Sequence, residues 1–334
     1  MEQRRSARIP AVVAVLALAG LGVAGCGSSG SDTGSSGGSG GGKKYDITLI
    51  TGVKGDAFYG SLACGAKQAA DRLGATLNVQ GPDRFDPSLQ TPIVNAVAAK
   101  KPDAVLIAVT DSKAMYAPLK QLASQGTKIV LVDTTLDDPS LAAAEVSSDN
   151  LAAGGLAARE VAREAGRSGS VLTVDVNPGI STTAARVNGF KAEAKRIGFT
   201  DLGVQYTGDD PAKASSVVTS TLAAHPDLAG VFATNTLTGE GAATGLRSAG
   251  KAGKVRLIGF DANPSGVEAI ERGVAQAQVV LKPLDIGYQG VEQAVNALSG
   301  KPVTKKILTG STIATRKNLN DPSVKRYLYT NSCS

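Results

Sequence analysis

Hydrogen-bonding side chains stand directly after several short apolar runs of the sequence. Asp133 follows KIVLV, Asn235 follows LAGVFAT, and Asp261 follows VRLIGF. Arg186 lies in TTAARVNGF, downstream of the run SVLTVDV. Carboxylates accept hydrogen bonds from hydroxyl groups, guanidinium groups donate them, and amides do both. This set of side chains favours binding of a small, neutral molecule that carries many hydroxyl groups.

A further group of side chains follows the first apolar run, YDITLIT. Lys54, Asp56, Phe58 and Tyr59 lie within KGDAFYG, in a chain that has only 6 Phe, 7 Tyr and no Trp. Aromatic faces cover the C–H surfaces of ligands. The adjacent aromatic pair therefore predicts a platform on which a ligand lies. Thr134 is an additional candidate for a ligand contact.

Most of these residues also have an ordinary structural interpretation. Asp and Asn after a strand frequently cap the next helix or begin a turn, and we expect Asp111 and Asp149 to be caps of this kind. Arg186 is also compatible with a helix surface, and Phe58 and Tyr59 with the core. The binding interpretation therefore depends on the whole set and not on one member.

The sequence lacks the patterns of common catalytic and metal sites. Its single histidine, His225, precedes Pro226 and is expected at the end of a helix. One His and scattered Cys do not give a zinc site of the usual spacing. Neither a G-x-x-x-x-G-K-[ST] loop nor a G-x-S-x-G turn is present. We therefore expect no catalysis, no metal ion and no cofactor.

Short apolar runs alternate with segments of helical periodicity along the chain. The runs are nearly continuous in apolar residues, which is typical of parallel strands buried on both faces. Their alternation with helices predicts βαβ units and a parallel sheet. The pattern occurs twice, and KPDAVLIAVT (101–110) is echoed by HPDLAGVFAT (225–234). We therefore expect an α/β protein built from two doubly wound parallel-sheet lobes.

A three-stranded hinge is expected to join the two lobes. The chain is predicted to cross near Ser147–Asn150, near Lys282 and near Thr309. In open parallel sheets, ligands bind beyond the carboxyl ends of the strands, so a ligand is expected between the lobes. The predicted parts are an N-terminal lobe of residues 45–149 plus 282–308, a C-terminal lobe of residues 150–281 plus 309–318, and a tail of residues 319–334.

The N-terminal residues have the pattern of an export and anchoring segment. Residues 1–25 form a predicted signal peptide with a basic start and the apolar run AVVAVLALAGLGVA, which is too short to span a bilayer comfortably. VAGC resembles a bacterial lipobox, so Cys26 is expected to carry a lipid; an ordinary signal peptide with an incidental Cys is the alternative. Residues 26–44 then form a flexible Gly/Ser tether.

Charge and cysteine content set further limits. Removal of residues 1–25 lowers the formal charge from +6 to +4, and no basic cluster with interleaved aromatics is present, so nucleic-acid binding is not expected.

Export places Cys64 and Cys333 in an oxidising environment. A disulfide between them would hold the tail and would be worth about 4–5 kcal/mol in the chain-entropy model. Two free thiols are the alternative.

Six stretches together resemble the type I periplasmic solute-binding proteins of ABC importers, of the ribose-binding kind. The stretches read FYGSLACGAKQAADRLG, SSDNLAAGG, TTAARVNGF, AAHPDLAGVFATN, LIGFDANPSG and KPLDIGYQGVEQA. The resemblance covers about four-fifths of the chain, from Tyr45 to about Asn318. The resemblance implies the periplasmic binding protein-like I fold. It also implies ligand contacts by Asp56, Phe58, Tyr59, Asp133, Arg186, Asn235 and Asp261. Lactose-repressor-type regulators share this fold, but they begin with a DNA-binding helix-turn-helix in place of a leader and tether.

The sequence departs from the family pattern at several positions. The family has a third ligand-binding aromatic in the second lobe, expected here near Asp209 or Asp210, where none is present. Ala108, Thr134 and Leu281 stand where the family has Asn, Arg and Gln. These departures argue against ribose itself as the ligand.

The resemblance implies an extracytoplasmic lipoprotein that binds a sugar or polyol and delivers it to the permease of an ABC importer. The protein would be a monomer anchored to the outer face of the bacterial cell membrane. Two alternatives from other classes stay open, a sensory receptor coupled to a membrane kinase and an enzyme on the same fold. The lack of a nucleophile–base pair disfavours the enzyme.

Overall fold

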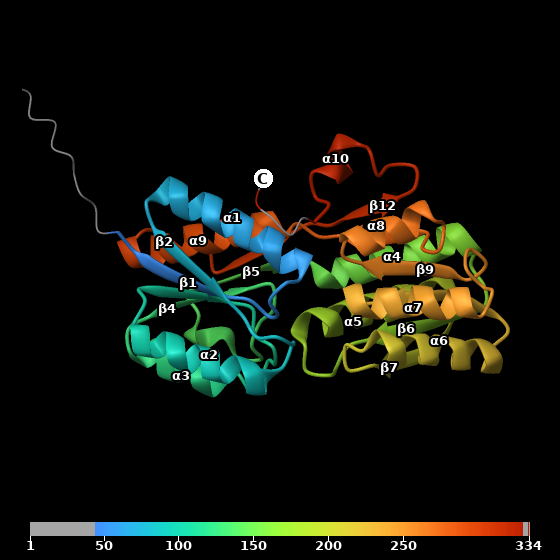
Figure 1. Cartoon of the computed structure of the whole chain (residues 1–334), viewed down its shortest axis with the longest axis horizontal. Helices are drawn as coiled ribbons and strands as arrows, with labels where there is room; N and C mark the ends of the chain where they lie inside the picture. Colours follow the sequence, from blue (N-terminus) through green and yellow to red (C-terminus); the bar gives the residue numbers. More distant parts are fainter. Residues whose placement is uncertain (1–43, 330–332, 334) are drawn as a thin grey trace, which may run out of the picture. The chain divides into compact units, whose positions relative to one another are not determined.

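The structure is a computed structural model that describes residues 44–329 and residue 333. The predictions for the signal peptide, for Cys26 and for most of the tether therefore lie outside the described residues. The described elements alternate between strands and helices through most of the chain (Figure 1). Within this part of the chain, no helix combines the length and the apolar character that crossing a membrane requires.

The first sheet has six strands in the order β11-β5-β4-β3-β1-β2, and all of its pairs are parallel. Helices α1 and α9 cover one face and α2 and α3 cover the other (Figure 1). Its elements are β1 (Asp46–Ile50), α1 (Ala57–Leu73), β2 (Thr76–Gln80), α2 (Pro87–Lys100), β3 (Ala104–Ile107), α3 (Tyr116–Ser124), β4 (Lys128–Val132), β5 (Ala144–Ser148), α9 (Pro283–Ser299) and β11 (Lys306–Thr309), with a 3₁₀ turn at Pro139–Leu141.

The second sheet has the equivalent order, β12-β10-β9-β8-β6-β7. Its elements are α4 (Asn150–Ala165), β6 (Ser170–Asp175), α5 (Ser181–Ile197), β7 (Thr200–Tyr206), α6 (Pro211–Ala224), β8 (Leu228–Ala233), α7 (Thr236–Ser248), β9 (Arg256–Phe260), α8 (Pro264–Glu271), β10 (Ala277–Val280) and β12 (Thr312–Thr315), followed by α10 (Pro322–Lys325). Strand β12 runs antiparallel to β10, which departs from the expected all-parallel sheet. Strands β11 and β12 lie in different sheets and are separated by only two residues, so β12 enters the second sheet directly from the hinge and not through a helical crossover of the kind that links the parallel strands.

The central strands have the continuous burial that their apolar sequences predict. Every residue of β3, β6 and β10 is buried, whereas the edge strand β2 contains only half-buried and exposed residues. Two-sided burial follows from helices that cover both faces of a parallel sheet. The strands therefore form a rigid base, and the residues beyond their carboxyl ends are held in fixed positions.

The chain passes between the two lobes three times. It crosses between β5 and α4, between β10 and α9, and between β11 and β12. The predicted fold class, two doubly wound lobes with a three-stranded hinge, is confirmed.

Close helix–helix contacts hold the elements that carry the candidate ligand residues. A Cβ at Gly65 of α1 would lie 1.9 Å from the carbonyl oxygen of Leu284 in α9, and a Cβ at Gly154 of α4 would lie 1.9 Å from the carbonyl oxygen of Arg186 in α5. Only glycine permits backbones to approach so closely. The contacts fix the position of α1, which begins with the aromatic pair, and of α5, which carries Arg186.

Candidate functional site

Two aspartates adopt the same unusual backbone conformation at equivalent places in the two sheets. Asp133 follows β4 with a φ of +64°, and Asp261 follows β9 with a φ of +71°. Asp133 donates its backbone N–H to the carbonyl of Val146 at 2.9 Å, and Asp261 donates to that of Val279 at 3.1 Å. A left-handed backbone in a non-glycine residue costs about 1–3 kcal/mol, and such strain clusters at ligand sites.

The Asp133 carboxylate has one bonded oxygen and one without a partner. The hydroxyl of Tyr59 donates to its Oδ2 at 2.9 Å. Its Oδ1 is buried and has no hydrogen-bond partner among residues 44–329 and 333. Burial raises the pKa of Asp133 to about 6, although the positive charge of Arg186 acts in the opposite direction. A buried acceptor without a donor is costly, so a ligand hydroxyl that bonds to Oδ1 would be strongly favoured.

The Asp261 carboxylate is buried to a similar extent on the second lobe. The hydroxyl of Tyr329 donates to its Oδ1 at 3.1 Å. Burial raises the pKa of Asp261 to about 7, whereas Arg186 lowers it and Asp56 raises it further. At neutral pH, this carboxyl group is therefore balanced between its charged and its neutral form.

Arg186 supplies the positive charge that acts on both aspartates. Its Nε donates to Oδ1 of Asn150 at 2.8 Å, and its Nη1 donates to the carbonyl of Thr234 at 2.6 Å. The guanidinium carbon lies 4.2 Å from the centre of the Phe260 ring. A guanidinium has five N–H donors, and these bonds to described residues use two of its nitrogens. The side chain is only 4% exposed, which is unusual for a charged residue without a functional or structural role.

The two aromatic residues at the start of α1 are positioned by the preceding aspartate. Asp56 is the N-cap of α1, and its carboxylate accepts from the backbone N–H groups of Phe58 at 2.8 Å and Tyr59 at 3.4 Å. Phe58 and Tyr59 are both buried, with ring centres 5.2 Å apart and perpendicular planes. Phe58 also lies edge-on to Tyr329, at 5.7 Å. The aromatic pair therefore packs partly into the core while Tyr59 directs its hydroxyl to Asp133.

These side chains form one group, which we call the interlobe cluster. It consists of Tyr59 and Asp133 from the first lobe, Arg186 and Asp261 from the second lobe, and Tyr329 from the C-terminal tail. Hydrogen bonds and electrostatic interactions connect all five members. The carboxylates and the guanidinium are buried, and each carboxylate already bonds to a tyrosine hydroxyl of the protein itself.

The remaining predicted ligand residues have other partners. Lys54 forms an ion pair of 2.5 Å with Asp83 on the exposed surface. Thr134 donates its hydroxyl to the carbonyl of Val109 at 2.7 Å. The structure does not join either residue to the interlobe cluster, because each side chain is engaged with a neighbour in its own lobe.

Asn235, which follows β8, caps a helix in addition to being a candidate ligand residue. It caps α7 in a capping box with Thr238, and its amide nitrogen donates to Asp209 at 2.7 Å. Helix α7 therefore begins at Thr236, directly after Asn235. Two other strand-end aspartates act as predicted, since Asp111 accepts from the backbone of Lys113 and Ala114, and Asp149 caps α4.

Two residues of the site region were not among the predicted ligand residues. Tyr329 lies in the tail, in a sequence without strand or helix periodicity, and only its aromatic character in YLYT was a signal. Gln90 is fully buried in α2 and joins the ends of β1 and β3, because its Nε2 donates to the carbonyls of Thr51 and Ala108 and its Oε1 accepts from the N–H of Thr110. A glutamine among apolar positions of a helix was the available signal for this role.

The histidine and the cysteines of the described part of the chain have structural roles. His225 is the C-terminal cap residue of α6, which confirms its predicted place at a helix end. In the described ranges, no group of three or more His, Cys, Asp or Glu side chains is arranged to hold a metal ion. Cys64 and Cys333 are joined in a disulfide, with their Cα atoms 5.3 Å apart.

The sequence matches a family model and several characterised relatives. Residues 47–302 match the model of the periplasmic binding protein domain. The ribose import binding protein of Salmonella typhimurium is 30% identical over 263 residues, which cover 79% of this chain and 88% of that protein. The ribose import binding protein of Bacillus subtilis is 30% identical over 277 residues, or 82% of this chain and 88% of that protein.

Solved structures with bound sugars have the same fold. An ABC transporter solute-binding protein from Agrobacterium vitis, bound with α-D-tagatopyranose, aligns with a TM-score of 0.84 and 39% identity over 86% of this chain and 100% of that chain. A second solute-binding protein from the same organism, bound with D-fucose, aligns with a TM-score of 0.80 and 31% identity over 85% of this chain and 100% of that chain. With its two parallel-sheet lobes and the family match over residues 47–302, this chain belongs to the periplasmic binding protein domain family of sugar-binding ABC transporter solute-binding proteins.

Proposed function

We propose that this protein captures a sugar or polyol between its two lobes and delivers it to the permease of an ABC importer. The observation that carries the proposal is the interlobe cluster, in which a buried carboxylate from each lobe interacts electrostatically with one buried guanidinium. The partnerless Oδ1 of Asp133 supports it, because a sugar hydroxyl is a donor that would satisfy this atom.

The charged groups of the interlobe cluster are sufficient in number for micromolar binding of a sugar. Micromolar binding corresponds to about −8 kcal/mol, and a hydrogen bond to a charged group contributes about 1.5–3 kcal/mol. Hydroxyl groups on Asp133 and Asp261, together with donors from Arg186, supply several such bonds. The aromatic rings of Phe58 and Tyr59 would add contact with the C–H surface of the ligand.

The relatives support a sugar but do not single out one. Their bound or named ligands include ribose, α-D-tagatopyranose and D-fucose. Ala108, Thr134 and Leu281 stand where ribose-binding proteins were expected to have polar groups, and all three are buried here. A ligand other than ribose is therefore the expected one. The relatives are import proteins and transporter components, which favours import over sensing and binding over catalysis.

Binding is expected to stabilise the closed arrangement of the lobes. Loops of the two lobes contact each other directly, since Ser112 donates its backbone N–H to the carbonyl of Gly179 at 3.1 Å and Thr135 donates to the Oγ of Ser181 at 2.9 Å. A ligand can bond to Asp133 and Asp261 at the same time only when the lobes are closed. It shifts the equilibrium by its differential affinity for that state, and the permease then recognises the closed form.

Substitution of Gly179 by alanine is expected to weaken sugar binding about tenfold, which corresponds to 1.4 kcal/mol. Gly179 has a φ of +92°, and a Cβ there would lie 2.7 Å from Oδ2 of Asp111 on the other lobe. The matched control is Gly208→Ala, because Gly208 also has a positive φ, +69°, but a Cβ there would have nothing within 4 Å. Calorimetric titration should show normal affinity for Gly208→Ala; equal affinities for the two variants would contradict the proposed closure.

Anchoring is part of the proposal. A lipid on Cys26 and the Gly/Ser tether would hold a monomeric receptor at the outer face of the cell membrane, close to its permease. The Cys64–Cys333 disulfide fits an oxidising, extracytoplasmic location. Intact mass of the exported protein under non-reducing conditions would report both the lipid and the disulfide.

The test of the proposed function is a thermal-shift screen of pentoses, hexoses, polyols and inositols against the full chain. At least one compound is expected to raise the unfolding midpoint in a concentration-dependent manner, because a ligand that binds only the folded state stabilises it by mass action. If no member of the panel stabilises the protein, the proposed function is wrong.

A further inference from the structure

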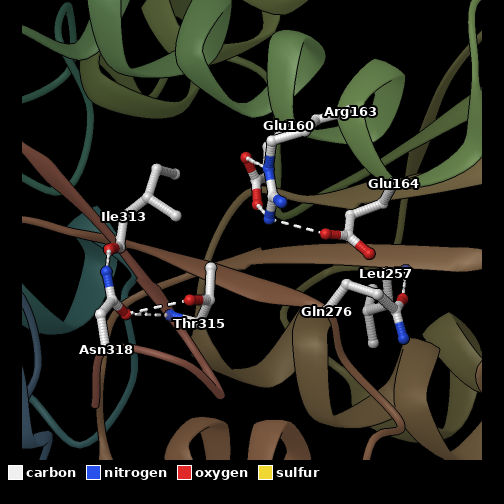
Figure 2. Close-up of polar contacts among 8 residues, drawn as sticks. All are labelled: Glu160, Arg163, Glu164, Leu257, Gln276, Ile313, Thr315 and Asn318. Carbon is white, nitrogen blue, oxygen red and sulfur yellow. Dashed lines mark hydrogen bonds and ion pairs between the residues drawn. The ribbon is translucent and has the colours of Figure 1, made fainter. Parts of the chain in front are cut away.

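The C-terminal tail is folded back onto the second lobe. Asn318 holds the turn after β12, since its Nδ2 donates to the carbonyl of Ile313 at 2.9 Å and its Oδ1 accepts from the N–H of Thr315 at 2.7 Å (Figure 2). Val324 of α10 is buried, and Tyr329 donates its backbone N–H to the carbonyl of Ala262 at 2.9 Å. Tyr329 therefore lies beside the end of β9, because Ala262 is the residue that directly follows Asp261.

Tyr329 contacts all the parts of the molecule that meet at the interlobe cluster. Its hydroxyl donates to Oδ1 of Asp261 on the second lobe and accepts from the N–H of Leu281 at the second hinge crossing, both at 3.1 Å. Its ring meets the ring of Phe58 from the first lobe. The side chain is 4% exposed. Tyr329 therefore brings an aromatic ring and a hydroxyl from the tail to the buried end of the second lobe.

The tail is also held at its far end. Cys333, four positions beyond Tyr329, forms the disulfide with Cys64, and Cys64 lies on the same helix, α1, as Phe58. The part of the tail that contains Tyr329 thus lies between an anchor on the second lobe, at Asn318, and a covalent anchor on the first lobe, at Cys64. This arrangement retains the tyrosine at the cluster.

We propose that Tyr329 is a ligand-specificity residue of the sugar site, and that the Cys64–Cys333 disulfide retains it there. The inference depends on the proposed function of the interlobe cluster. The Tyr329 ring lies edge-on to the Phe58 ring, at 5.7 Å, and so extends the aromatic surface against which the C–H face of a sugar packs. The hydroxyl occupies one oxygen of Asp261, so Asp261 accepts a hydroxyl of the sugar mainly through its other oxygen. The site therefore selects sugars that present a single hydroxyl to Asp261.

The central experiment compares Tyr329→Phe with wild type by calorimetric titration, with the sugar from the panel that stabilises wild type most. The phenylalanine keeps the ring but removes the donor to Asp261. Affinity is expected to fall about tenfold at pH 7, because the hydroxyl lowers the pKa of Asp261 and its loss leaves less of this carboxyl group charged; tenfold corresponds to about one pKa unit. The matched control is Tyr327→Phe in the same tail, whose ring lies against Lys282 and Arg326, and its affinity should equal that of wild type.

A pH profile separates a role in the site from a structural role. The Tyr329 hydroxyl lowers the pKa of Asp261, so its loss should move the pH at which binding is half lost to a higher value. A tail that merely supports the fold would leave this pH unchanged. The titratable and charged groups that act on Asp261 are Arg186, Asp56, Asp133, Tyr59 and Tyr329, and only the last is altered.

Cys333→Ser provides a second variant that leaves every side chain of the cluster intact. It should lower the affinity about tenfold as well, and reduction of wild type by dithiothreitol should have the same effect. If wild type binds the sugar and both variants bind it equally well with an unchanged pH profile, the inference about Tyr329 is wrong although the proposed function holds. If wild type binds no sugar of the panel, the proposed function itself fails.

Discussion

Arg186→Ala is expected to weaken sugar binding about a hundredfold or more, since it removes at least two hydrogen-bonding contributions from a charged donor, each of about 1.5–3 kcal/mol. It also removes the positive charge that stabilises the carboxylate forms of Asp133 and Asp261. Without this charge, both aspartates should be more fully protonated at neutral pH and should bind hydroxyl groups less strongly. Calorimetric titration with the sugar that stabilises wild type measures the effect directly.

Two further variants make the result for Arg186 interpretable. Arg186→Ala also loses the bonds to Asn150 and Thr234, so its unfolding midpoint without sugar should fall. Arg186→Lys keeps the charge but not the planar fork of donors, and its affinity should lie between those of wild type and the alanine variant. Arg196→Ala is the control on the same helix, because Arg196 is exposed and pairs with Glu193. Affinity of wild-type strength in Arg186→Ala would exclude Arg186 from the site.

Sugar affinity is expected to fall about a hundredfold or more between pH 8 and pH 5, because protonation of a required carboxylate reduces binding up to tenfold per pH unit below its pKa. Burial raises the pKa of Asp133 to about 6 and that of Asp261 to about 7 in the protein without ligand. Both groups are therefore mostly charged at pH 8 and mostly neutral at pH 5. Charged carboxylates form the stronger bonds with sugar hydroxyls.

The stability of the unliganded protein should depend on pH in the opposite direction. The pKa values of these two groups in the folded state lie above the ordinary aspartate value of 3.8, so the folded state binds more protons than the unfolded state between about pH 4 and pH 7. Their contribution to stability is therefore greatest at low pH and is lost as the pH rises through this range. Asp261→Asn should flatten both trends relative to wild type. Affinity that stays constant from pH 8 to pH 5 would show that the carboxylate forms are not required.

Much of the fold was predictable from local sequence patterns. Continuous apolar runs such as AVLI at Ala104–Ile107 identified buried parallel strands, and their alternation with helices predicted two doubly wound lobes and the hinge. The antiparallel direction of β12 was not predictable in this way. Strand direction depends on the length of the connection and on distant pairing with β10, neither of which leaves a periodic pattern in TIAT.

The candidate site was predictable only as a set of positions. Asp133, Arg186 and Asp261 were identified because the carboxyl ends of parallel strands and the helices that follow them meet at one edge. The same argument also selected Thr134 and Asn235, which the structure engages in bonds to Val109 and to Asp209 and Thr238. A cap and a ligand contact need the same kind of oxygen at the same place, so local sequence does not distinguish them.

Tyr329 illustrates a different limit of prediction. It reaches Asp261 across 68 positions of sequence, from a tail whose path is set by β12, by α10 and by the bond between Cys64 and Cys333. The two cysteines indicated that the tail is held, but they did not indicate which tail residue lies at the cluster. Long-range placement of this kind is determined by packing and covalent connection rather than by local pattern.

The most direct test of the central claim is a crystal structure of the protein with the sugar that gives the largest thermal shift. The sugar is expected between the lobes, with one hydroxyl on Oδ1 of Asp133, one on Asp261, and donors from Arg186. A sugar bound elsewhere would contradict the claim, for example in the cavity of about 350 Å³ between α7 and α8, lined by Glu240 and Arg272. So would an interlobe cluster that stays closed on its own side chains with no sugar inside it.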